Sequence, residues 1–535
     1  MGGGPLRGLP PLRRGVLCDR CRTGRRRRPQ HPHALNGVTD VHIVELIDTY
    51  LAGHGDRVRA TDHTGSWTGH RLGERARRLA GGLQARGVRR GDRVGVMMAN
   101  GVDVLVAYEA IWRAGAAITP LMPALVPDEV AHILGSAEPA AVLVSADTAE
   151  TVRAARTTAG GTFPLVGDGG DISWKEVEAE PVPVGRDEED LAAVLFTGGT
   201  TGRSKGVMLT HRNLTAAAAM AATADDAGPE DVSLVTLPLS HGFGLIAFLV
   251  TYLRPLRLLV RRRFAPDAFA ATVQAEGVTV ADVVPAMLQA LLDRGHVHSG
   301  ALRSLRNLYV GGAPCPPDLI ETVEDALPVR VIEGYGLTES GTLIAGDSPS
   351  RPHRRGSVGI PFEGVEVRIV EPDGRDAPPG RIGEIIVRGP AVMAGYWRDE
   401  AATAEAIRGG WLHTGDLGSL DGDGHLRIAG RRKELIIRGG FNIHPADLEN
   451  AIRTCPGVAG VGVVGLPDQA RGERVVAAVV GTCTAADVHR HCRDGVAGPK
   501  RPDEVVIMQR LPLTPVGKLD RNALVAALTA RSAAS

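Results

Sequence analysis

The sequence predicts an α/β protein with a large N-terminal domain of helix-covered sheets, a β-rich subdomain and a small mobile α+β domain at its C-terminal end. In the first third, amphipathic helical segments alternate with short apolar strands, which is typical of parallel sheets covered by helices. From about residue 358 the strands become shorter and are broken by Gly, Pro and Asp, as at residues 365–370 and 383–388. A chain of 535 residues, 43% of them apolar, is too long for one hydrophobic core.

The helices and strands of the first third follow one another in a regular order. Five apolar residues at helical spacing predict one helix, and residues 92–98 predict the strand that follows it. Residues 102–113 and 127–134 predict two further helices, which are followed by strands at residues 116–119 and 140–144. The apolar face of the first helix consists of Leu72, Ala76, Leu79, Ala80 and Leu83.

Composition sets the expected domain boundaries. Residues 1–36 combine many arginines with Gly and Pro and contain no apolar segment, so we expect a disordered basic extension. Residues 37–430 are predicted to form the N-terminal domain, and residues 431–433 a polar joint. Residues 434–530 then form a compact α+β domain of about 100 residues.

The charge balance argues against binding to nucleic acid or anionic membranes, and the cysteine content favours a reducing compartment. We therefore expect the protein in the cytoplasm. The chain has 61 acidic and 61 basic residues, so no overall field attracts nucleic acid or an anionic membrane. Its six cysteines are scattered, unlike the framework of a secreted disulfide protein. The apolar run at residues 245–253 ends at Arg254, well short of about 18 residues, so it predicts buried core and no stable membrane anchor.

A glycine-rich loop carries the strongest local signal for chemistry. Residues 197–206 place four glycines and three threonines around one lysine, so that backbone N–H groups, hydroxyls and an ammonium can converge on a polyphosphate. Lys205 follows Ser204 and precedes Gly206, an order that differs from the P-loop of nucleotide hydrolases. The loop therefore predicts ATP binding with another geometry, while an ordinary turn in a chain of 68 glycines stays an alternative.

A second polar segment follows a predicted strand end at residues 330–333. In the glycine-flexed turn at residues 334–339, Tyr335 could stack on a base, Thr338 could bind a phosphate oxygen and Glu339 could hold Mg²⁺. The alternative is a helix with Thr338 as its N-cap and Glu339 in its first turn. The presence of both segments in one chain favours a nucleotide site.

Eight motifs in this order resemble the adenylate-forming (AMP-binding) superfamily of acyl-CoA synthetases, luciferases and peptide-synthetase adenylation domains, over residues 41–528. Gly198 stands where many members have Ser, and Ser204 where most have Pro, so we expect a slightly more flexible loop but the same reaction class. Besides the two segments above, the motifs are Pro238-Leu239-Ser240-His241, Gly311-Gly312-Ala313-Pro314, Gly383-Glu384 with Gly395-Tyr396-Trp397, residues 411–416, residues 430–433 and residues 512–518.

The resemblance implies an ATP-dependent acid–thiol ligase that forms an acyl-AMP with release of pyrophosphate and transfers the acyl group to coenzyme A. Joining a carboxylate to ATP brings two anions together, so catalysis depends on positioning and charge compensation. Lys518, Thr338 and Glu339 are then catalytic, and Glu339 holds Mg²⁺. The implied phosphate loop comprises Thr197, Gly198, Gly199, Thr200, Thr201, Gly202 and Lys205, and the adenine and ribose contacts comprise Gly312, Ala313, Pro314, Glu333, Gly334, Tyr335, Asp416 and Arg431.

The resemblance also implies a moving C-terminal domain. A lysine between carboxylate and phosphate occupies the path that the thiol needs, so the two half-reactions require different arrangements. In the family the domain rotates about a residue that corresponds to Lys433. Gly439 and Gly440 would then line the thiol tunnel.

The acid is expected to be apolar, with a fatty, aryl or alicyclic group. Family members that activate α-amino acids carry an aspartate near residues 240–243, and no acid occurs from residue 238 to 252. Only residues 519–535 follow Lys518, which favours free coenzyme A over a fused carrier protein. A ligase that loads a separate acyl carrier protein and a non-catalytic ATP-binding scaffold stay as alternatives. The implied acyl pocket consists of His241, Phe243, Val284 and Gly336, beside Gly312.

Overall fold

The structure is a computed structural model and describes residues 41–197, 204–224, 227–347, 354–438, 441–468, 471–496, 498–514 and 518–534. The predicted extension at residues 1–36 lies outside these ranges. So do seven predicted site residues, namely Gly198, Gly199, Thr200, Thr201, Gly202, Gly439 and Gly440.

The first sheet contains nine strands, in the order β15-β14-β13-β12-β11-β9-β10-β1-β2. The strands from β13 to β1 in this order run parallel, whereas β2, β14 and β15 are antiparallel to their neighbours. All four residues of β11 are buried, as expected for a parallel strand covered on both faces. The strands are β1 (Val58–Asp62), β2 (Gly65–Thr68), β9 (Val232–Val235), β10 (Arg257–Val260), β11 (Val280–Val283), β12 (Asn307–Val310), β13 (Arg330–Tyr335), β14 (Ala345–Gly346) and β15 (Ile360–Pro361).

The second sheet contains seven strands, in the order β18-β8-β7-β4-β3-β5-β6. The strands from β7 to β6 in this order are parallel, and β7 and β8 form an antiparallel pair that β18 extends. The strands are β3 (Arg93–Met97), β4 (Ala117–Pro120), β5 (Ala141–Val144), β6 (Leu165–Gly167), β7 (Leu191–Thr197), β8 (Lys205–Thr210) and β18 (Gly395–Tyr396).

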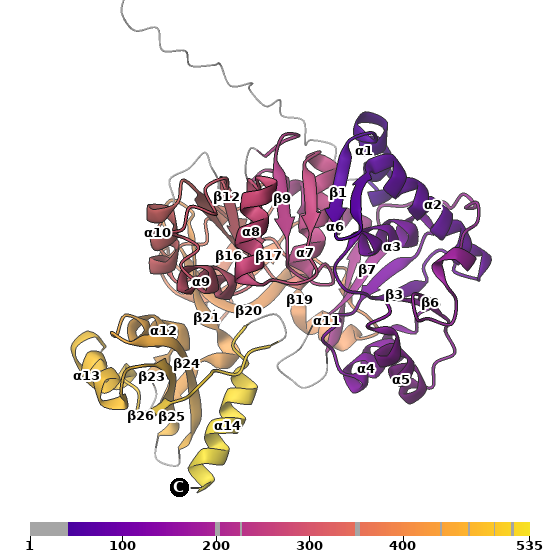
Figure 1. The fold of residues 1–535 in the computed structure, drawn as a ribbon. Coiled ribbons are helices and arrows are strands. Elements are labelled where there is room, and N and C mark those ends of the chain that lie inside the picture. Colours follow the sequence, from indigo (N-terminus) through magenta and orange to yellow (C-terminus); the bar gives the residue numbers. More distant parts are fainter. Residues whose placement is uncertain are drawn as a thin grey trace, which may run out of the picture. The chain divides into compact units, whose positions relative to one another are not determined.

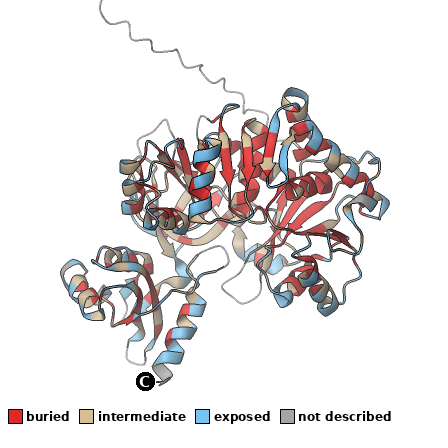
Figure 2. Ribbon diagram, viewed as in Figure 1, coloured by how far each residue is buried: buried red, intermediate tan, exposed pale blue. Residues whose placement is uncertain are grey.

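Helices cover both faces of these two sheets, so helices and sheets alternate in layers (Figure 1). Helix α3 contacts β1 of the first sheet and β3 of the second, and α6 and α7 pack on each other in the same layer. The largest hydrophobic core fills this layer of helices. Figure 2 shows the strands of the two sheets as mostly buried. The helices of this layer are α1 (Ile43–His54), α2 (Gly69–Ala85), α3 (Val102–Arg113), α6 (His211–Ala222) and α7 (Gly242–Leu253).

Two smaller cores lie on the outer faces. One packs α4 (Pro127–Ala137) and α5 (Ala149–Ala159) against the second sheet, and a short 3₁₀ helix η1 (Trp174–Glu176) follows β6. The other packs α8 (Pro266–Glu276), α9 (Pro285–Asp293) and α10 (Pro317–Ala326) against the first sheet. Each sheet is therefore buried on both faces, as the alternation of helix and strand predicts.

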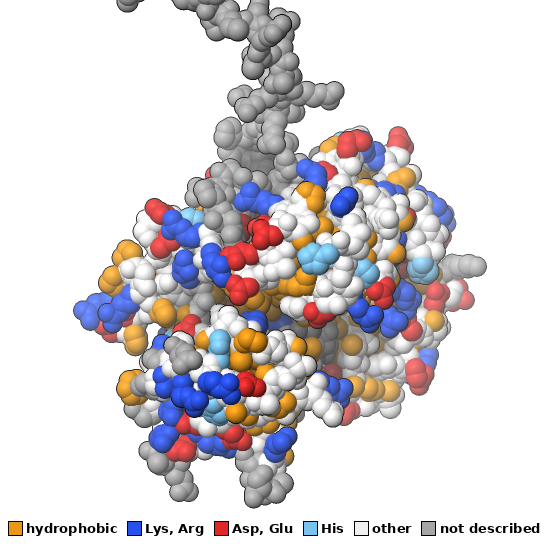
Figure 3. Space-filling view, turned by 60° about the vertical axis from the view of Figure 1, so that its left-hand side comes forward, with side chains coloured by type: hydrophobic (Ala, Val, Ile, Leu, Met, Phe, Trp, Pro, Cys, Tyr) orange, Lys and Arg blue, Asp and Glu red, His pale blue; other side chains and the backbone are white. Residues whose placement is uncertain are grey.

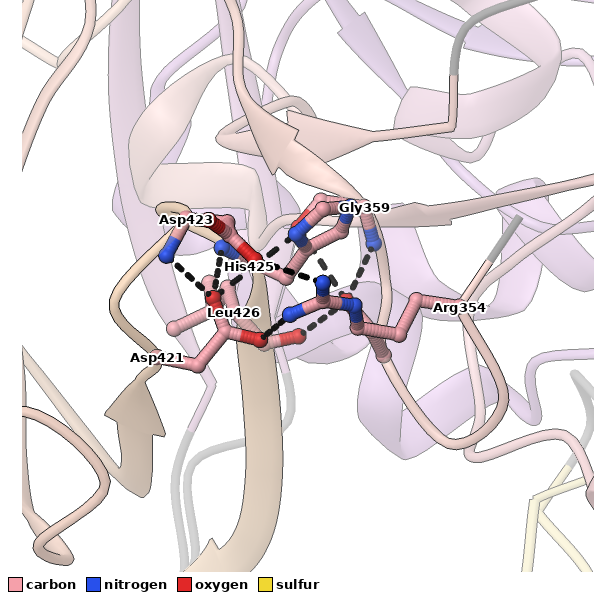
Figure 4. A network of polar contacts seen from close by, with 7 residues as sticks. Arg354, Gly359, Asp421, Asp423, His425 and Leu426 are labelled. Carbon is pink, nitrogen blue, oxygen red and sulfur yellow. Dashed lines mark hydrogen bonds and ion pairs between the residues drawn. The ribbon is translucent and has the colours of Figure 1, made fainter. Parts of the chain in front are cut away.

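A third sheet is antiparallel throughout and forms the predicted β-rich subdomain. A polar network fixes the turn of its β20–β21 hairpin (Figure 4). Arg354 donates to Asp421 and, at 2.6 Å, to Asp423, while Leu426 N–H donates to the carbonyl of Gly359 at 2.8 Å. The elements are β16 (Glu366–Val370), β17 (Gly383–Arg388), α11 (Glu400–Ala406), β19 (Ile407–Arg408), β20 (Trp411–Leu420) and β21 (Leu426–Arg431).

The C-terminal part has its own sheet and two cores. Alternate residues of β25 face opposite cores, with Val475, Ala477 and Val479 on one side and Val476 and Ala478 on the other. Helices α12 and α13 cover the first side and α14 covers the second. The elements are η3 (Arg432–Glu434), β22 (Ile436–Arg438), β23 (Phe441–Ile443), α12 (Pro445–Arg453), β24 (Val458–Asp468), β25 (Gly472–Gly481), α13 (Ala485–Gly495), η4 (Gly498–Lys500), β26 (Glu504–Ile507) and α14 (Arg521–Ala534).

The structure confirms the predicted α/β class and most of the predicted elements. The five residues of the predicted first helix face lie in α2 and are buried, and the apolar run at residues 245–253 lies in α7. The turn predicted at residues 334–339 begins later, because β13 continues through Tyr335. The four cysteines in the described ranges are free.

The surface agrees with the balanced charge of the chain. Figure 3 shows acidic and basic side chains interspersed over one face. Surface ion pairs in the described ranges include Arg77 with Glu74, Arg388 with Glu366 and Arg398 with Glu138. Across the described ranges, no helix combines the length and the apolar composition that a membrane crossing requires.

Candidate functional site

Three of the predicted motifs and the predicted pocket residue Val284 lie at the carboxyl ends of neighbouring parallel strands. In the order β13, β12, β11, β9, each strand leads into one of them. Residues 238–241 come shortly after β9, Val284 follows β11, Gly311 follows β12 and Tyr335 ends β13. The carboxyl ends of parallel strands meet at one edge of a sheet, where ligands bind in open α/β folds. The fold therefore brings together motifs that are far apart in the sequence.

The ends of the glycine-rich loop are held by a β-hairpin. Thr197 ends β7 and Lys205 begins β8, and the two residues pair across the strands. The ring nitrogen Nε2 of His132 lies 3.2 Å from the carbonyl oxygen of Ser204, next to Lys205. Gly206 packs tightly, because an added Cβ would lie 2.8 Å from Val194 and 3.2 Å from Trp397. The hairpin therefore fixes where Lys205 leaves the sheet.

Three predicted nucleotide residues form one polar cluster. The phenol of Tyr335 donates to Oδ2 of Asp416 at 2.7 Å, and Nε of Arg431 lies 3.2 Å from Oδ1 of Asp416. Asp416 and Arg431 are also register partners of β20 and β21. Burial raises the pKa of Asp416, while Arg431 and Tyr335 oppose this shift. The carboxylate is thus oriented by both partners, and the hairpin of Figure 4 carries two of the three residues.

Lys518 belongs to the same cluster. Its carbonyl accepts from Thr514 N–H at 2.7 Å, and its own N–H donates to Thr514 Oγ1 at 3.1 Å, so Thr514 anchors the backbone of Lys518. Burial and the charge of Arg431 lower the pKa of Lys518, whereas Asp416 raises it. An added Cβ on Gly312 would lie 4.0 Å from Cε of Lys518. The predicted catalytic lysine therefore lies beside predicted ribose and adenine residues.

The predicted acyl-pocket residues lie next to this cluster. His241 is the N-cap of α7, and its Nδ1 accepts from Phe243 N–H at 3.3 Å. Burial and the charge of Lys518 lower the pKa of His241 to about 4, so the ring is neutral near pH 7. An added Cβ on Gly312 would lie 3.7 Å from Cγ1 of Val284. His241 thus caps a helix and at the same time faces Lys518.

A glycine is required at one place where two backbone segments of this region meet. An added Cβ on Gly336 would lie 2.1 Å from the carbonyl oxygen of Thr342, so only glycine fits there. An added Cβ on Gly311 would lie 3.4 Å from the ring of Phe243. Phe243 and Val284 therefore lie beside backbone that carries no side chains.

Glu339 is held by a residue to which the sequence assigned no role. The phenol of Tyr396 donates to Oε1 of Glu339 at 2.9 Å, and Nζ of Lys205 lies 5.1 Å from the centre of the Tyr396 ring. Burial and the Glu339 carboxylate raise the pKa of Tyr396, so the phenol stays protonated. Glu339 and Tyr396 are 57 residues apart, and the only signal in the sequence is the motif that contains Tyr396.

The residues around Glu339 fit a bound Mg²⁺. Among the described residues, Oε2 of Glu339 accepts no hydrogen bond, and no group of three or more His, Cys, Asp or Glu side chains could bind a metal by itself. Mg²⁺ in phosphate-binding sites is held by one or two carboxylates together with substrate phosphates and water. The available carboxylate oxygen of Glu339 is such a donor.

The other predicted site residues have definite places as well. Thr338 begins the 3₁₀ helix η2 (Thr338–Ser340), whose N-cap is Leu337, so the alternative of Thr338 as an N-cap is wrong. Glu333 is buried in β13, one residue before Gly334. Ala313 and Pro314 follow β12, and Ala313 is partly exposed whereas Pro314 is exposed.

The predicted hinge lies at the junction between two sheets. Lys433 is the middle residue of η3, between β21 and β22. The preceding residue is anchored, since Arg432 donates to Oε2 of Glu384 at 3.1 Å. The 3₁₀ turn of η3 is short and its three residues have no buried side chain.

Comparisons with known proteins agree with this arrangement. Residues 47–397 match the AMP-binding enzyme family, and residues 447–518 match the AMP-binding enzyme C-terminal domain. The feruloyl-CoA synthase of Amycolatopsis sp is 38% identical over 455 residues, which cover 84% of this chain and 91% of that protein. The long-chain-fatty-acid–CoA ligase of Escherichia coli O6:H1 is 31% identical over 532 residues, which cover 90% of this chain and 94% of that protein.

A solved structure gives the same result for the fold. The crystal structure of ATP-bound MatB from Rhodopseudomonas palustris superposes with a TM-score of 0.85 at 32% sequence identity, and the match covers 91% of this chain and 99% of that chain. Since family, relatives and fold agree over most of its length, the chain belongs to the AMP-binding enzyme family.

Proposed function

We propose that this protein is an AMP-forming acid–thiol ligase of acyl-CoA synthetase type. It converts an apolar carboxylic acid and coenzyme A to a thioester and cleaves ATP to AMP and pyrophosphate. The observation that carries the proposal is the convergence of Lys518, Asp416 and Arg431 beside the carboxyl ends of the parallel strands. Relatives named feruloyl-CoA synthase and long-chain-fatty-acid–CoA ligase support the reaction class.

The first half-reaction joins the acid to AMP. A carboxylate oxygen attacks the α-phosphorus of ATP, and the bond between the α-phosphorus and its bridging oxygen breaks, so that pyrophosphate leaves with the electron pair. Lys518 would offset the charge of the two anions, and Lys205 that of the outer phosphates. Asp416 would accept from the ribose hydroxyls while Tyr335 and Arg431 hold it. Mg²⁺, when bound at Glu339, supplies further positive charge beside the phosphates.

The second half-reaction transfers the acyl group. The sulfur of coenzyme A attacks the carbonyl carbon, the bond from that carbon to the AMP oxygen breaks, AMP leaves with the electron pair and the thiol proton passes to solvent. The joint at residues 431–433, which ends with Lys433, would let the C-terminal domain withdraw Lys518 from the site. Gly439 and Gly440 would then line the path of the thiol.

The acid is proposed to carry a fatty, aryl or alicyclic group. Phe243 and Val284 offer apolar surface, and His241 is neutral. The ammonium of an α-amino acid would lose its hydration there, and residues 238–252 offer no carboxylate to pair with it, a loss of several kcal/mol. A cytoplasmic location agrees with the use of ATP and coenzyme A.

Two assays of the purified protein test the proposal. Acid-dependent exchange of labelled pyrophosphate into ATP detects the first half-reaction, and mass spectrometry of products from a panel of acids with Mg-ATP and free coenzyme A detects the second. We expect both for ferulic, benzoic or medium-chain fatty acids. Exchange without a thioester would instead indicate an acyl carrier protein as acceptor, and binding of ATP without exchange would indicate a scaffold.

A further inference from the structure

We propose that Tyr396 is a positioning residue of the phosphate site, which holds the Glu339 carboxylate for Mg²⁺ and seats the Lys205 ammonium on its ring. The inference rests on the proposed function, because it assigns Glu339 to the metal and Lys205 to phosphate. In this role Tyr396 does not contact the reacting atoms itself. It acts through the other two residues.

Glu339 is fixed from one segment at two points. The phenol of Tyr396 donates to Oε1 of its carboxylate at 2.9 Å, and Met393 N–H donates to its backbone carbonyl at 2.9 Å. One carboxylate oxygen is thereby occupied, and in the described part of the chain the other accepts no hydrogen bond. A carboxylate with one oxygen held and one available presents a single oxygen in a set direction. Hydrogen-bonded partners of this kind orient metal ligands.

The same segment is anchored on the strand that begins with Lys205. Tyr396 pairs with Val207 of β8, and Trp397 N–H donates to the carbonyl of Gly206 at 2.7 Å. The N–H of Tyr396 donates to Thr403 Oγ1 at 2.8 Å, which fixes the backbone from the other side. The segment therefore sets the separation between Glu339 on η2 and Lys205 on β8.

The ring of Tyr396 also meets Lys205 directly. Nζ of Lys205 lies 5.1 Å from the ring centre, within the range in which an ammonium is attracted to an aromatic face. The carboxylate is held by the hydroxyl and the ammonium by the ring, so the two functions of Tyr396 reside on different atoms. Substitutions can therefore separate them.

The test measures metal and nucleotide binding without turnover. The probe is Mn²⁺, followed by electron paramagnetic resonance, with an ATP analogue that carries a methylene group between its α and β phosphorus atoms. Tyr396→Phe keeps the ring and removes the hydroxyl, so we expect the Kd for Mn²⁺ to rise about tenfold. Binding of the analogue in EDTA should stay unchanged. Tyr396→Leu removes both functions, and the analogue should then also bind more weakly in EDTA.

Two controls separate positioning from general damage. Tyr50→Phe removes a buried hydroxyl that has no hydrogen-bond partner among the described residues, and it should leave Mn²⁺ binding unchanged. In a Glu339→Gln background, Tyr396→Phe should have no further effect on Mn²⁺ binding, because the residue it acts through is already replaced. Melting temperatures check that each variant is folded.

The possible results distinguish a wrong role for Tyr396 from a wrong proposed function. An unchanged Kd for Mn²⁺ in folded Tyr396→Phe, or equal losses with and without Glu339→Gln, overturns the positioning role. If the wild-type protein neither binds the analogue nor exchanges pyrophosphate, the proposed function fails and not merely the role of Tyr396.

Discussion

The phenol of Tyr335 donates a 2.7 Å hydrogen bond to the carboxylate of Asp416, 81 residues further along the chain. Tyr335 ends β13 of the first sheet, and Asp416 lies in β20 of the third. Asp416 is only 6% exposed, and its second oxygen lies 3.2 Å from Nε of Arg431. This contact joins two sheets at the point where the ribose of ATP is expected.

Tyr335→Phe should weaken ATP binding about tenfold, because a hydrogen bond to a charged group contributes roughly 1.5–3 kcal/mol and Arg431 still holds Asp416. The measurement is the Kd for ATP by calorimetry. An unchanged Kd would show that the Tyr335 hydroxyl does not orient the ribose-binding carboxylate. Tyr50→Phe is the matched control, since it also removes a phenolic hydroxyl.

Lys518→Ala should slow acid-dependent pyrophosphate exchange roughly 100- to 1000-fold, as expected when a preorganised charge-stabilising donor is removed. Thioester formation from supplied acyl-AMP should persist, because that step does not join two anions. Equal losses in both half-reactions, measured by exchange and by product mass, would mean that Lys518 is structural.

The exchange reaction should also respond to alkaline pH through Lys518. Burial and Arg431 lower the pKa of this ammonium, so it loses its proton at a lower pH than an exposed lysine does. Exchange should then fall as the pH rises through that lowered pKa. Lys518→Arg stays charged and should show no such fall, although its overall rate is lower. The measurement is the pH profile of exchange for both proteins.

Lys433→Pro should spare pyrophosphate exchange and block thioester release. Proline fixes φ near −65° and restricts the preceding residue, so the joint can adopt fewer backbone conformations. Pyrophosphate exchange and the mass of the thioester product measure how much each half-reaction is slowed. Overall turnover equal to that of the wild type would contradict rotation about this joint. Lys500→Pro, in the short helix η4 of the C-terminal domain, controls for a general effect of proline.

The enzyme should ignore α-amino acids. In a competition assay, phenylalanine should support less than about one hundredth of the exchange given by 3-phenylpropionate, since burying an unpaired ammonium is unfavourable by several kcal/mol. The two acids differ only by the amino group. Stronger exchange with phenylalanine would show that the pocket contains a carboxylate partner outside residues 238–252.

Two buried histidines should make the fold sensitive to acid. The rings of His42 and His211 stack with centroids 3.5 Å apart, and they are 4% and 1% exposed. Burial is the main reason that the pKa of His42 is lowered to about 4 and that of His211 well below its ordinary value, with Arg186 acting in the same direction. Between pH 6.5 and about 4 the unfolded chain therefore binds more protons than the folded chain, and stability falls as the pH falls.

His42→Asn should flatten this dependence. Asn keeps an N-cap acceptor for Val44 N–H, which His42 Nδ1 now binds at 3.1 Å, but it does not titrate. Through His42, whose pKa is lowered to about 4, the wild type should lose roughly 1.5 kcal/mol between pH 6.5 and 5, and the variant correspondingly less. Thermal unfolding at the two pH values measures the difference. Parallel losses in both proteins would show that His42 does not contribute.

Local patterns in the sequence predicted elements well, and pairing between distant strands much less. The apolar spacing of α2 and the alternation of helix and strand are short-range signals, so they indicate helices and strands directly. The order of the nine-stranded sheet depends on pairs such as Ala60 with Leu258, which no local pattern indicates. Strands of two residues, such as β18, carry no periodic signal at all.

The same limit applies to the site. The motifs around Tyr335, Asp416 and Lys518 were predicted from their resemblance to a family. Their proximity could not be predicted from one sheet edge, because Tyr335 ends a parallel strand of the first sheet, Asp416 lies in the antiparallel third sheet and Lys518 lies in the C-terminal part. The contact of Tyr396 with Glu339 and Lys205 could not be predicted, because it needs β18 to pair with β8. A tyrosine in a motif without an assigned role was the only hint.

The pairing of Thr197 with Lys205 fixes both ends of the predicted phosphate loop in one sheet. Both ends of the intervening segment are joined by strands that belong to a buried sheet, so the sheet holds the ends together whatever lies between them. Doubling the length of such a segment adds only about 0.6 kcal/mol of closure entropy. We therefore expect substitutions at residues 198–204 to change how tightly and how fast ATP is bound, while the rest of the protein folds as before.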